Sequence, residues 1–378
     1  MHTKLKNKTV KTFIHSLFFT LVSSFSLAQI VNIPDVKFKQ YLINQSEINT
    51  NGDNEIQVSE AIAFTGTIEC FNLGINSLAG IESFVNITSL ICHQNNLTLL
   101  DLSNNTRLNN INCSDNQIVN LDFSNNLSLK FIDCQNNKLT TLTLGNNSVL
   151  SSLVCERNEL KILNLMNNIG LETLWCSSNQ LNSLVLPTSN LLKELACSQN
   201  HLFNVNFSNS LGLQMLYIAQ NELQTLDLSN NIELKMLWAI DNKLKNLNIK
   251  NGNNHNIDFF DVTNNSELTC IQVDDVNYSE TNWTAVDAIA NFSTNCDAFM
   301  SIDNFSKNSI KIYPNPAKNI VHFSEQTNVE IFNSLGQKVK SEKNIKSIDV
   351  SKISKGMYFI VLKNNLGKEI QKTKIIKE

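Results

Sequence analysis

Charged side chains are scarce in this chain. Of its 378 residues, 17% are Asp, Glu, Lys or Arg, and the net charge at pH 7 is -4. A chain without a basic excess lacks the electrostatic footprint of a nucleic-acid binder. Beyond the first 28 residues, no apolar run approaches the roughly 20 residues that a membrane-spanning helix needs. The sequence therefore predicts neither a nucleic-acid partner nor a transmembrane segment in the mature protein.

Signature motifs of catalysis are also missing. The chain has no Gly-x-Ser-x-Gly turn, no phosphate-binding glycine loop and no His-Glu-x-x-His. Two histidines, His2 and His15, lie within the first 28 residues, and none of the others has a second plausible metal ligand nearby in sequence. The sequence therefore predicts that the protein is not an enzyme.

The dominant feature of the chain is a 21-residue period. Six cysteines stand 21 residues apart, and an asparagine follows each of them after three residues. A fixed period of this length indicates one structural unit repeated along an axis. The six cysteines are Cys92, Cys113, Cys134, Cys155, Cys176 and Cys197.

One repeat illustrates how each turn is expected to fold. Leu90, Ile91 and Cys92 are predicted to form a short parallel strand, with Ile91 on the concave surface and its two neighbours pointing inward. The amide of Asn95 can pair with backbone groups where the chain turns away. Each inward leucine contributes roughly 1.5–3 kcal/mol only when the next turn covers it. A single turn would therefore not fold alone.

The spacing Leu-x-x-Leu-x-Cys-x-x-Asn-x-Leu, found at 87–97 and 171–181, resembles the leucine-rich repeat. The resemblance covers roughly residues 68–262 and is similar to bacterial surface proteins of the internalin type. It implies a mainly β solenoid of short parallel strands with small helical caps. A second asparagine column recurs in Leu-x-Leu-Ser-Asn-Asn, and we assign it to the first asparagine of each pair, such as Asn104 and Asn125.

Nine cysteines in an exported chain would ordinarily suggest disulfides. Equivalent residues of stacked strands lie about 4.8 Å apart with parallel Cβ vectors, which is wider than the ~3.8 Å between Cβ atoms that a disulfide prefers. The periodic cysteines are therefore predicted to be buried free thiols, with metal ligation as the weaker alternative. Cys270 and Cys296 break the period and are the predicted disulfide of a C-terminal cap.

Residues 49–60 resemble an EF-hand calcium loop. Asn49, Asn51 and Asp53 occupy the first three ligand positions, Glu55 would offer its carbonyl, and Glu60 would be the bidentate carboxylate. An asparagine stands at the first position and another replaces the usual glycine, and both depart from the pattern. Two interpretations stay open: a weak structural Ca²⁺ site, or a relic loop that holds no metal. No other cofactor is expected.

From about residue 309 the repeat ends and lysine becomes common. The motifs at 312–316, 335–337, 356–358 and 374–377 resemble, in order, the type A C-terminal sorting domain of the type IX secretion system. The resemblance implies a small β-sandwich that directs the protein across the outer membrane of a Bacteroidetes-type bacterium and is then removed. The secretion machinery would be one partner. An adhesive sandwich domain is the alternative.

The first 28 residues have the features of a secretory signal peptide, with lysines before an apolar stretch and Ser-Leu-Ala at the predicted cleavage site. The expected mature protein is secreted or attached to the outer-membrane surface. The predicted organisation is a signal peptide at 1–28, an N-terminal cap at 29–66, the solenoid at 67–266, a C-terminal cap at 267–297, a linker at 298–308 and the sorting domain at 309–378.

Large apolar side chains gather on the concave surface predicted for the last turns. The register assigns them as Trp175, Tyr217, Trp238, Met215, Met236 and Ile240. Exposed apolar clusters mark interaction sites, and Trp and Tyr anchor protein interfaces. The alternative is a strand face on which the aromatic side chains only pack against one another.

These features together predict a non-catalytic, monomeric binding protein. Its partner would be a protein on another cell or on the same surface, recognised through the concave face. A carbohydrate-binding adhesin and a purely structural surface protein are the alternatives.

Overall fold

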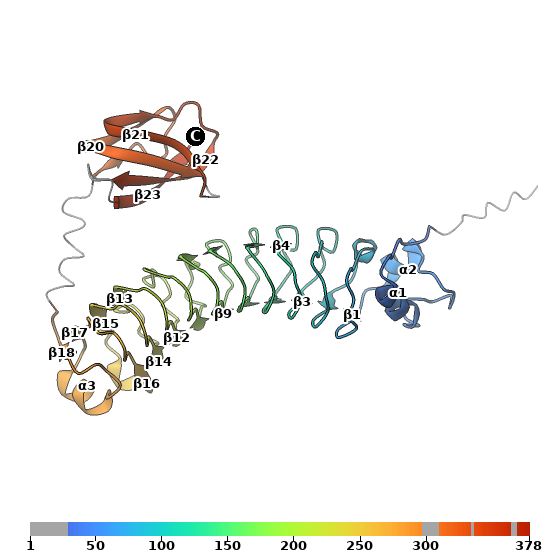
Figure 1. Ribbon diagram of the computed structural model, residues 1–378, viewed down its shortest axis with the longest axis horizontal. Helices are drawn as coiled ribbons and strands as arrows, with labels where there is room; N and C mark the ends of the chain where they lie inside the picture. Colours follow the sequence, from blue (N-terminus) through green and yellow to red (C-terminus); the bar gives the residue numbers. More distant parts are fainter. Residues whose placement is uncertain (1–28, 297–309, 334–335, 364–368) are drawn as a thin grey trace, which may run out of the picture. The chain divides into compact units, whose positions relative to one another are not determined.

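The structure, a computed structural model, describes residues 29–296, 310–333, 336–363 and 369–378. The predicted signal peptide and linker lie outside these residues. The described part of the chain forms two compact units, which divide between His201 and Leu202 (Figure 1). Each unit is taken by itself below.

The first unit begins with a small helical cap. Helix α1 (Val36–Ile43) starts at Asp35, whose carboxylate accepts hydrogen bonds from two backbone amides of the first turn. Phe38 and Leu42 lie one turn apart on α1 and are fully buried. Helix α2 (Val58–Ala63) starts with a capping box between Gln57 and Glu60. The two helices therefore supply the polar caps and apolar face that close the N-terminal end of the repeats.

Short parallel strands stacked one turn apart form the body of the first unit. Partner residues are 22 positions apart between the first two strands and 21 apart thereafter, as in Leu90 beside Ile111. The strands in order are β1 (Thr67–Glu69), β2 (Ser89–Ile91), β3 (Asn110–Asn112), β5 (Phe131–Asp133), β7 (Ser152–Val154), β9 (Thr173–Trp175) and β11 (Glu194–Ala196).

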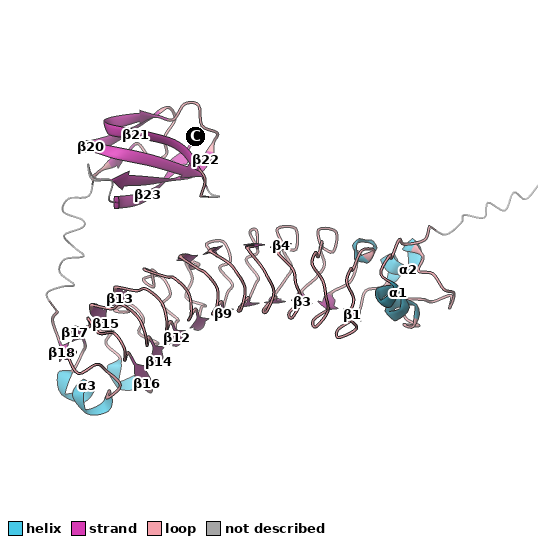
Figure 2. Ribbon diagram, viewed as in Figure 1, coloured by secondary structure: helices cyan, strands magenta, loops and turns pink. Residues whose placement is uncertain are grey.

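The return half of each turn is extended rather than helical. It carries two two-stranded sheets and one short 3₁₀ segment, and Figure 2 shows strand and loop throughout these turns. The sheets pair β4 (Asn120–Asp122) with β6 (Thr141–Thr143) and β8 (Ile162–Asn164) with β10 (Ser183–Val185); the 3₁₀ segment is η1 (Ile81–Ser83). The predicted mainly β, parallel-strand solenoid is confirmed.

The asparagine after each cysteine slot joins consecutive turns. Asn116 donates through Nδ2 to the carbonyl oxygens of Cys113 in its own turn and Cys92 in the preceding one, both at 3.1 Å. Its Oδ1 accepts from the backbone amide of Leu97 at 2.9 Å. The residue before it, Asp115, has φ of 53°, a left-handed conformation that a polar side chain of this kind tolerates. These bonds satisfy backbone groups that would otherwise be buried unpaired.

The assignment of the second asparagine column was wrong by one residue. Asn104 and Asn125 are exposed, whereas the second member of each pair, Asn105 and Asn126, is fully buried. The backbone amide of Asn105 donates to the carbonyl of Leu102 at 3.0 Å. This tight turn points the second side chain inward, where the Nδ2 of Asn105 donates to two carbonyls of the preceding turn.

The seven cysteines of the solenoid are free and buried, and their sulfurs pack among leucines. Burial raises the pKa of the Cys70 and Cys113 thiols to about 12. A thiol that stays protonated is a poor nucleophile and a poor metal ligand. The cysteine column therefore behaves as a column of small apolar side chains.

The second unit continues the same template with two parallel sheets. One contains β12 (Met215–Tyr217), β14 (Met236–Trp238) and β16 (Phe259–Asp261), and the other contains β13 (Thr225–Asp227), β15 (Asn246–Asn248), β17 (Cys270–Gln272) and β18 (Asn291–Ser293). A 3₁₀ segment, η2 (Asn254–Asn256), precedes β16.

A cap closes these repeats. Cys270 and Cys296 form a disulfide with a Cα–Cα distance of 6.1 Å. Trp283 is buried against the ring of Phe260, with the ring centroids 4.3 Å apart. The helix, α3 (Val276–Asn282), is shorter than the expected span of 277–292. It stops because Phe292 and its neighbours form β18, which extends the sheet beside β17.

The C-terminal residues form a separate antiparallel sheet with a core of its own. Its strands are β19 (Ile312–Tyr313), β20 (Ile320–Asn333), β21 (Lys338–Asp349), β22 (Gly356–Lys363) and β23 (Glu369–Lys377). Alternate residues of β20 and β22, such as Ile331 and Ile360, are buried in that core. The hydrogen bonds join all five strands into one sheet, rather than the two sheets of the predicted β-sandwich.

Candidate binding surface

The strand face of the second unit is the side of β12, β14 and β16 on which alternate residues point outward. The middle residues Leu216, Leu237 and Phe260 are buried, so their neighbours on each strand lie on the strand face. The register places Met236 between Met215 and Phe259, and Trp238 beside Tyr217. This arrangement brings large apolar side chains from three consecutive turns together.

The aromatic rings on this face touch one another in sequence. The Tyr217 and Trp238 ring centroids are 6.2 Å apart with planes tilted by 57°. The centroids of Trp238 and Phe259 are 6.1 Å apart with planes tilted by 56°. Trp238 remains 42% exposed and Phe259 40% exposed. We call this surface the aromatic ribbon, and it consists of Met215, Tyr217, Met236, Trp238, Ile240 and Phe259.

Phe259 was missed by the sequence prediction. The preceding turn is two residues longer than the others, so that Met236 pairs with a residue 23 positions later. The strand signal was nevertheless present. Phe260, Val262 and Asn265 repeat the spacing of the inward leucine, the cysteine slot and the buried asparagine, and all three are buried. The same template, allowed one insertion, would have placed Phe259 on the strand face.

Trp175, the sixth residue predicted for the concave site, belongs to the first unit. It lies on β9 and is 38% exposed, and its Nε1 donates to the Glu194 carboxylate at 3.0 Å. Its neighbours on the strand face of the first unit are mostly polar, including Asn112 and Asp133. Desolvation raises the pKa of Asp133 above the usual range for a carboxyl. Trp175 is thus one anchored ring on a largely polar face.

The residues predicted to bind calcium are held by hydrogen bonds among themselves. Asn49 Oδ1 accepts from the Gly52 amide, and Asn51 Oδ1 accepts from the Asp53 amide. Asp53 Oδ1 accepts from the Glu55 amide at 2.7 Å. The loop is therefore closed without any ligand.

Glu60 does not fit the part of a bidentate calcium ligand in this arrangement. Its Oε1 accepts from the amide and hydroxyl of Thr50 and from the Asn51 amide, and its Oε2 accepts from the Gln57 amide. Burial tends to raise the pKa of Glu60, but these donors outweigh it and lower the pKa. In the part of the chain that the structure describes, no group of three or more His, Cys, Asp or Glu is placed to hold a metal ion.

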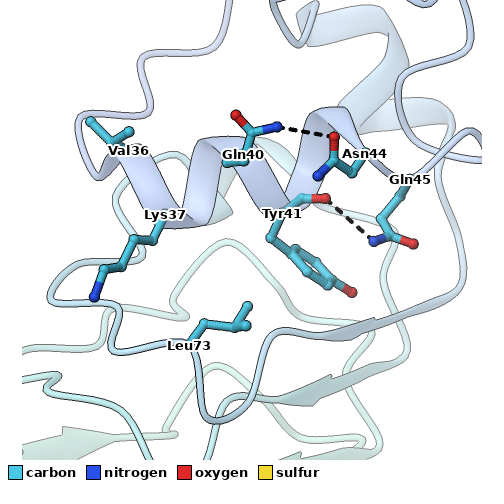
Figure 3. A pocket seen from close by; sticks show the side chains of 7 residues that line it. All are labelled: Val36, Lys37, Gln40, Tyr41, Asn44, Gln45 and Leu73. Atoms are coloured by element: carbon cyan, nitrogen blue, oxygen red, sulfur yellow. Dashed lines mark hydrogen bonds between the residues drawn. The ribbon is translucent and has the colours of Figure 1, made fainter.

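A hollow of about 440 Å³ lies on the N-terminal cap, between α1 and the loop that carries Leu73 (Figure 3). Its polar side chains are already paired: Gln40 Nε2 donates to Asn44 Oδ1, and Gln45 Nε2 donates to the Tyr41 carbonyl. The hollow thus offers no free catalytic pair.

Comparison with known proteins defines the C-terminal domain. The sequence model of the secretion system C-terminal sorting domain matches residues 311–378. The class of the protein is thus a leucine-rich repeat solenoid joined to a secretion sorting domain. This domain marks the protein for export through the type IX secretion system, to be secreted or attached to the cell surface. No helix within the described residues is long and apolar enough to cross a membrane.

The repeats are similar to proteins of other bacteria. Over 47 residues the chain is 45% identical to Internalin J of Listeria monocytogenes serotype 4b (strain F2365), a match that spans 12% of this chain and 5% of that protein. The solved functional domain of InlJ from Listeria monocytogenes, described as including a cysteine ladder, is 19% identical, with 93% of this chain and 100% of that chain covered and a TM-score of 0.39. The Leptospira interrogans leucine-rich repeat protein LIC12759 is 17% identical, with 62% and 69% covered and a TM-score of 0.48.

Proposed function

We propose that the exported solenoid is a non-catalytic binding protein and that the aromatic ribbon contacts a protein partner. The observation that carries the proposal is the pair of half-exposed rings, Trp238 and Phe259, in contact on one strand face. Contiguous exposed apolar side chains are costly in water and mark interaction surfaces. Trp and Tyr are also the side chains that most often anchor protein interfaces.

Ring geometry favours a protein over a glycan. A sugar ring packs face-on against an aromatic ring, so a platform for a linear glycan needs neighbouring rings that share a plane. The rings of Tyr217, Trp238 and Phe259 are instead tilted by 57° and 56° from one another. Tilted rings leave wedge-shaped gaps, which suit branched apolar side chains. The methionines beside them have flexible thioethers that adapt to such side chains.

The proposal is tested by capture with residues 29–378 as bait. A Tyr217→Ala, Trp238→Ala, Phe259→Ala variant is compared with the unaltered chain and with Phe203→Ala. Phe203 is 63% exposed and lies outside the strands, so it controls for the loss of an exposed ring. Each bait is offered surface extracts of neighbouring cells and a glycan array.

We expect a protein to be captured by the unaltered chain and by Phe203→Ala, and lost with the triple variant. Equal capture by all three baits would place the site elsewhere. A glycan lost with the triple variant would support the adhesin alternative, and no capture by any bait would support the structural one.

A further inference from the structure

The sorting domain carries a charge opposite to that of the rest of the protein. Residues 310–378 contain 13 lysines, no arginine and six acidic residues, which gives a net charge of +7 within a chain whose total is -4. The mature chain, residues 29–378, carries -8, because the first 28 residues contain four lysines and no acidic residue. The basic charge of the mature protein is thus confined to the sorting domain.

Part of this charge frames an apolar strip on the outer side of the sheet. The core takes Ile331 and Ile360, so the alternate residues Phe332 and Phe359 point away from it. These two phenylalanines are direct partners on β20 and β22. Met357, two residues before Phe359 on β22, lies on the same side.

Lysines flank the strip on both outer strands. Lys338 on β21 is the partner of Phe332, and Lys374 on β23 is the partner of Phe359. The Lys338 Nζ lies 5.9 Å from the Phe332 ring centroid, and the Lys372 Nζ lies 5.8 Å from that of Phe359. We call this surface the lysine–phenylalanine face, and it consists of Phe332, Phe359, Met357, Lys338, Lys372 and Lys374.

One carboxylate tempers the charge of this face. Glu330 lies between Lys338 and Lys363, with Nζ–O distances of 2.7 and 2.8 Å. Hydrogen bonds from these two lysines lower the pKa of Glu330, so the carboxylate stays charged. Lys372 and Lys374 are both exposed and form no ion pair with a described residue. Their charges are therefore available to an anionic partner.

We propose that the lysine–phenylalanine face adsorbs to an anionic lipid surface, with the ammonium groups on headgroup phosphates and the rings at the acyl boundary. The residue types favour lipid over an acidic protein. Protein interfaces are enriched in arginine and depleted in lysine, and this domain has lysine alone. Lysine keeps its hydrated ammonium in water while its stem lies along apolar surface. Each lysine near an anionic membrane contributes about 1 kcal/mol.

The test is co-sedimentation of residues 29–378 with vesicles of phosphatidylglycerol and phosphatidylcholine, against vesicles of phosphatidylcholine alone. Because the mature chain is net negative, binding to anionic vesicles requires a localised basic face. The test variant is Lys338→Gln, Lys372→Gln, Lys374→Gln. The control, Lys318→Gln, Lys352→Gln, Lys355→Gln, removes the same charge from exposed loop positions. Circular dichroism and thermal melting check that each variant is folded.

We expect the unaltered chain and the control to bind the anionic vesicles and the test variant to bind them on the order of 100-fold more weakly, about fivefold per lysine. Binding should also fall as salt is raised, because the Debye length shortens to about 3 Å at 1 M. A Phe332→Ala, Phe359→Ala variant should bind more weakly at every salt concentration. No binding by the unaltered chain, equal binding to both kinds of vesicle, or an equal loss in both lysine variants would overturn the proposal.

Discussion

The strand faces of the two units differ although their interiors follow one template. Inward positions hold leucine, a small apolar residue and a buried asparagine in turn after turn. Outward positions hold Asn112 and Asp133 in the first unit, but Tyr217 and Trp238 in the second. The interior is therefore constrained by folding, because each turn must match its neighbour. The outer face is free of that constraint, so its apolar character points to binding.

The largest test of this contrast is the response of the interior to alkali. The seven solenoid thiols have an ordinary pKa of 9.0, and burial raises the folded pKa of Cys70 and Cys113 to about 12. The unfolded chain then loses thiol protons from about pH 9, while the folded chain keeps them. Stability is thus fully present below pH 9 and falls as pH rises from 9 towards 12.

Urea unfolding between pH 7 and pH 10 measures this effect. Each thiol should lower the free energy of unfolding by about 1.4 kcal/mol at pH 10, on the order of 10 kcal/mol for seven. A variant with alanine at Cys113 and Cys134 should lose correspondingly less. A pH-independent free energy would show that the thiols are not buried in solution.

Neighbouring residues on one strand give the next largest effect. Leu237→Ala should lower the free energy of unfolding by about 2–5 kcal/mol, because a buried side chain leaves a cavity. Trp238→Ala removes a larger side chain that is 42% exposed, and should cost about 1 kcal/mol from its two ring contacts. Denaturant titrations of both variants measure the difference. A larger loss for the tryptophan variant would make Trp238 part of the core.

The two members of an asparagine pair should differ by a smaller amount. Asn126 is buried and its Nδ2 donates to the carbonyls of Leu102 and Asn105, both at 3.0 Å. Asn126→Ala should cost about 1–3 kcal/mol, since those carbonyls lose their partner. Asn125→Ala, at an exposed position, should cost less than about 0.5 kcal/mol. Thermal melts of the two variants decide the comparison, and equal losses would contradict the assigned turn.

The smallest expected effect is that of calcium on the N-terminal cap. The Glu60 oxygens already accept four hydrogen bonds, so millimolar Ca²⁺ should leave the Tm unchanged and a chelator should not lower it. Glu60→Gln should lower the Tm with or without calcium, because a neutral amide is a weaker acceptor. A Tm that rises with calcium and falls with chelator would restore the metal site.

Periodic positions were predictable from the sequence and isolated ones were not. The inward Leu90 and the asparagine three residues beyond each cysteine follow from a repeat that occurs many times. The second asparagine column failed because both members of each pair recur, and only the turn at Asn105 distinguishes them. Phe259 was missed because a two-residue insertion broke the count. The length of α3 failed because β18 pairs with a strand distant in sequence, which no local pattern records.

The central claim, that the aromatic ribbon is a binding surface, is tested most directly by the affinity of the captured partner. The Kd for the unaltered chain, for Trp238→Ala and for Phe203→Ala would be measured by calorimetry with protein shown to be folded. The account predicts a loss of at least about 2 kcal/mol for Trp238→Ala, roughly 30-fold in Kd, and no change for Phe203→Ala. An unchanged Kd for Trp238→Ala would contradict it.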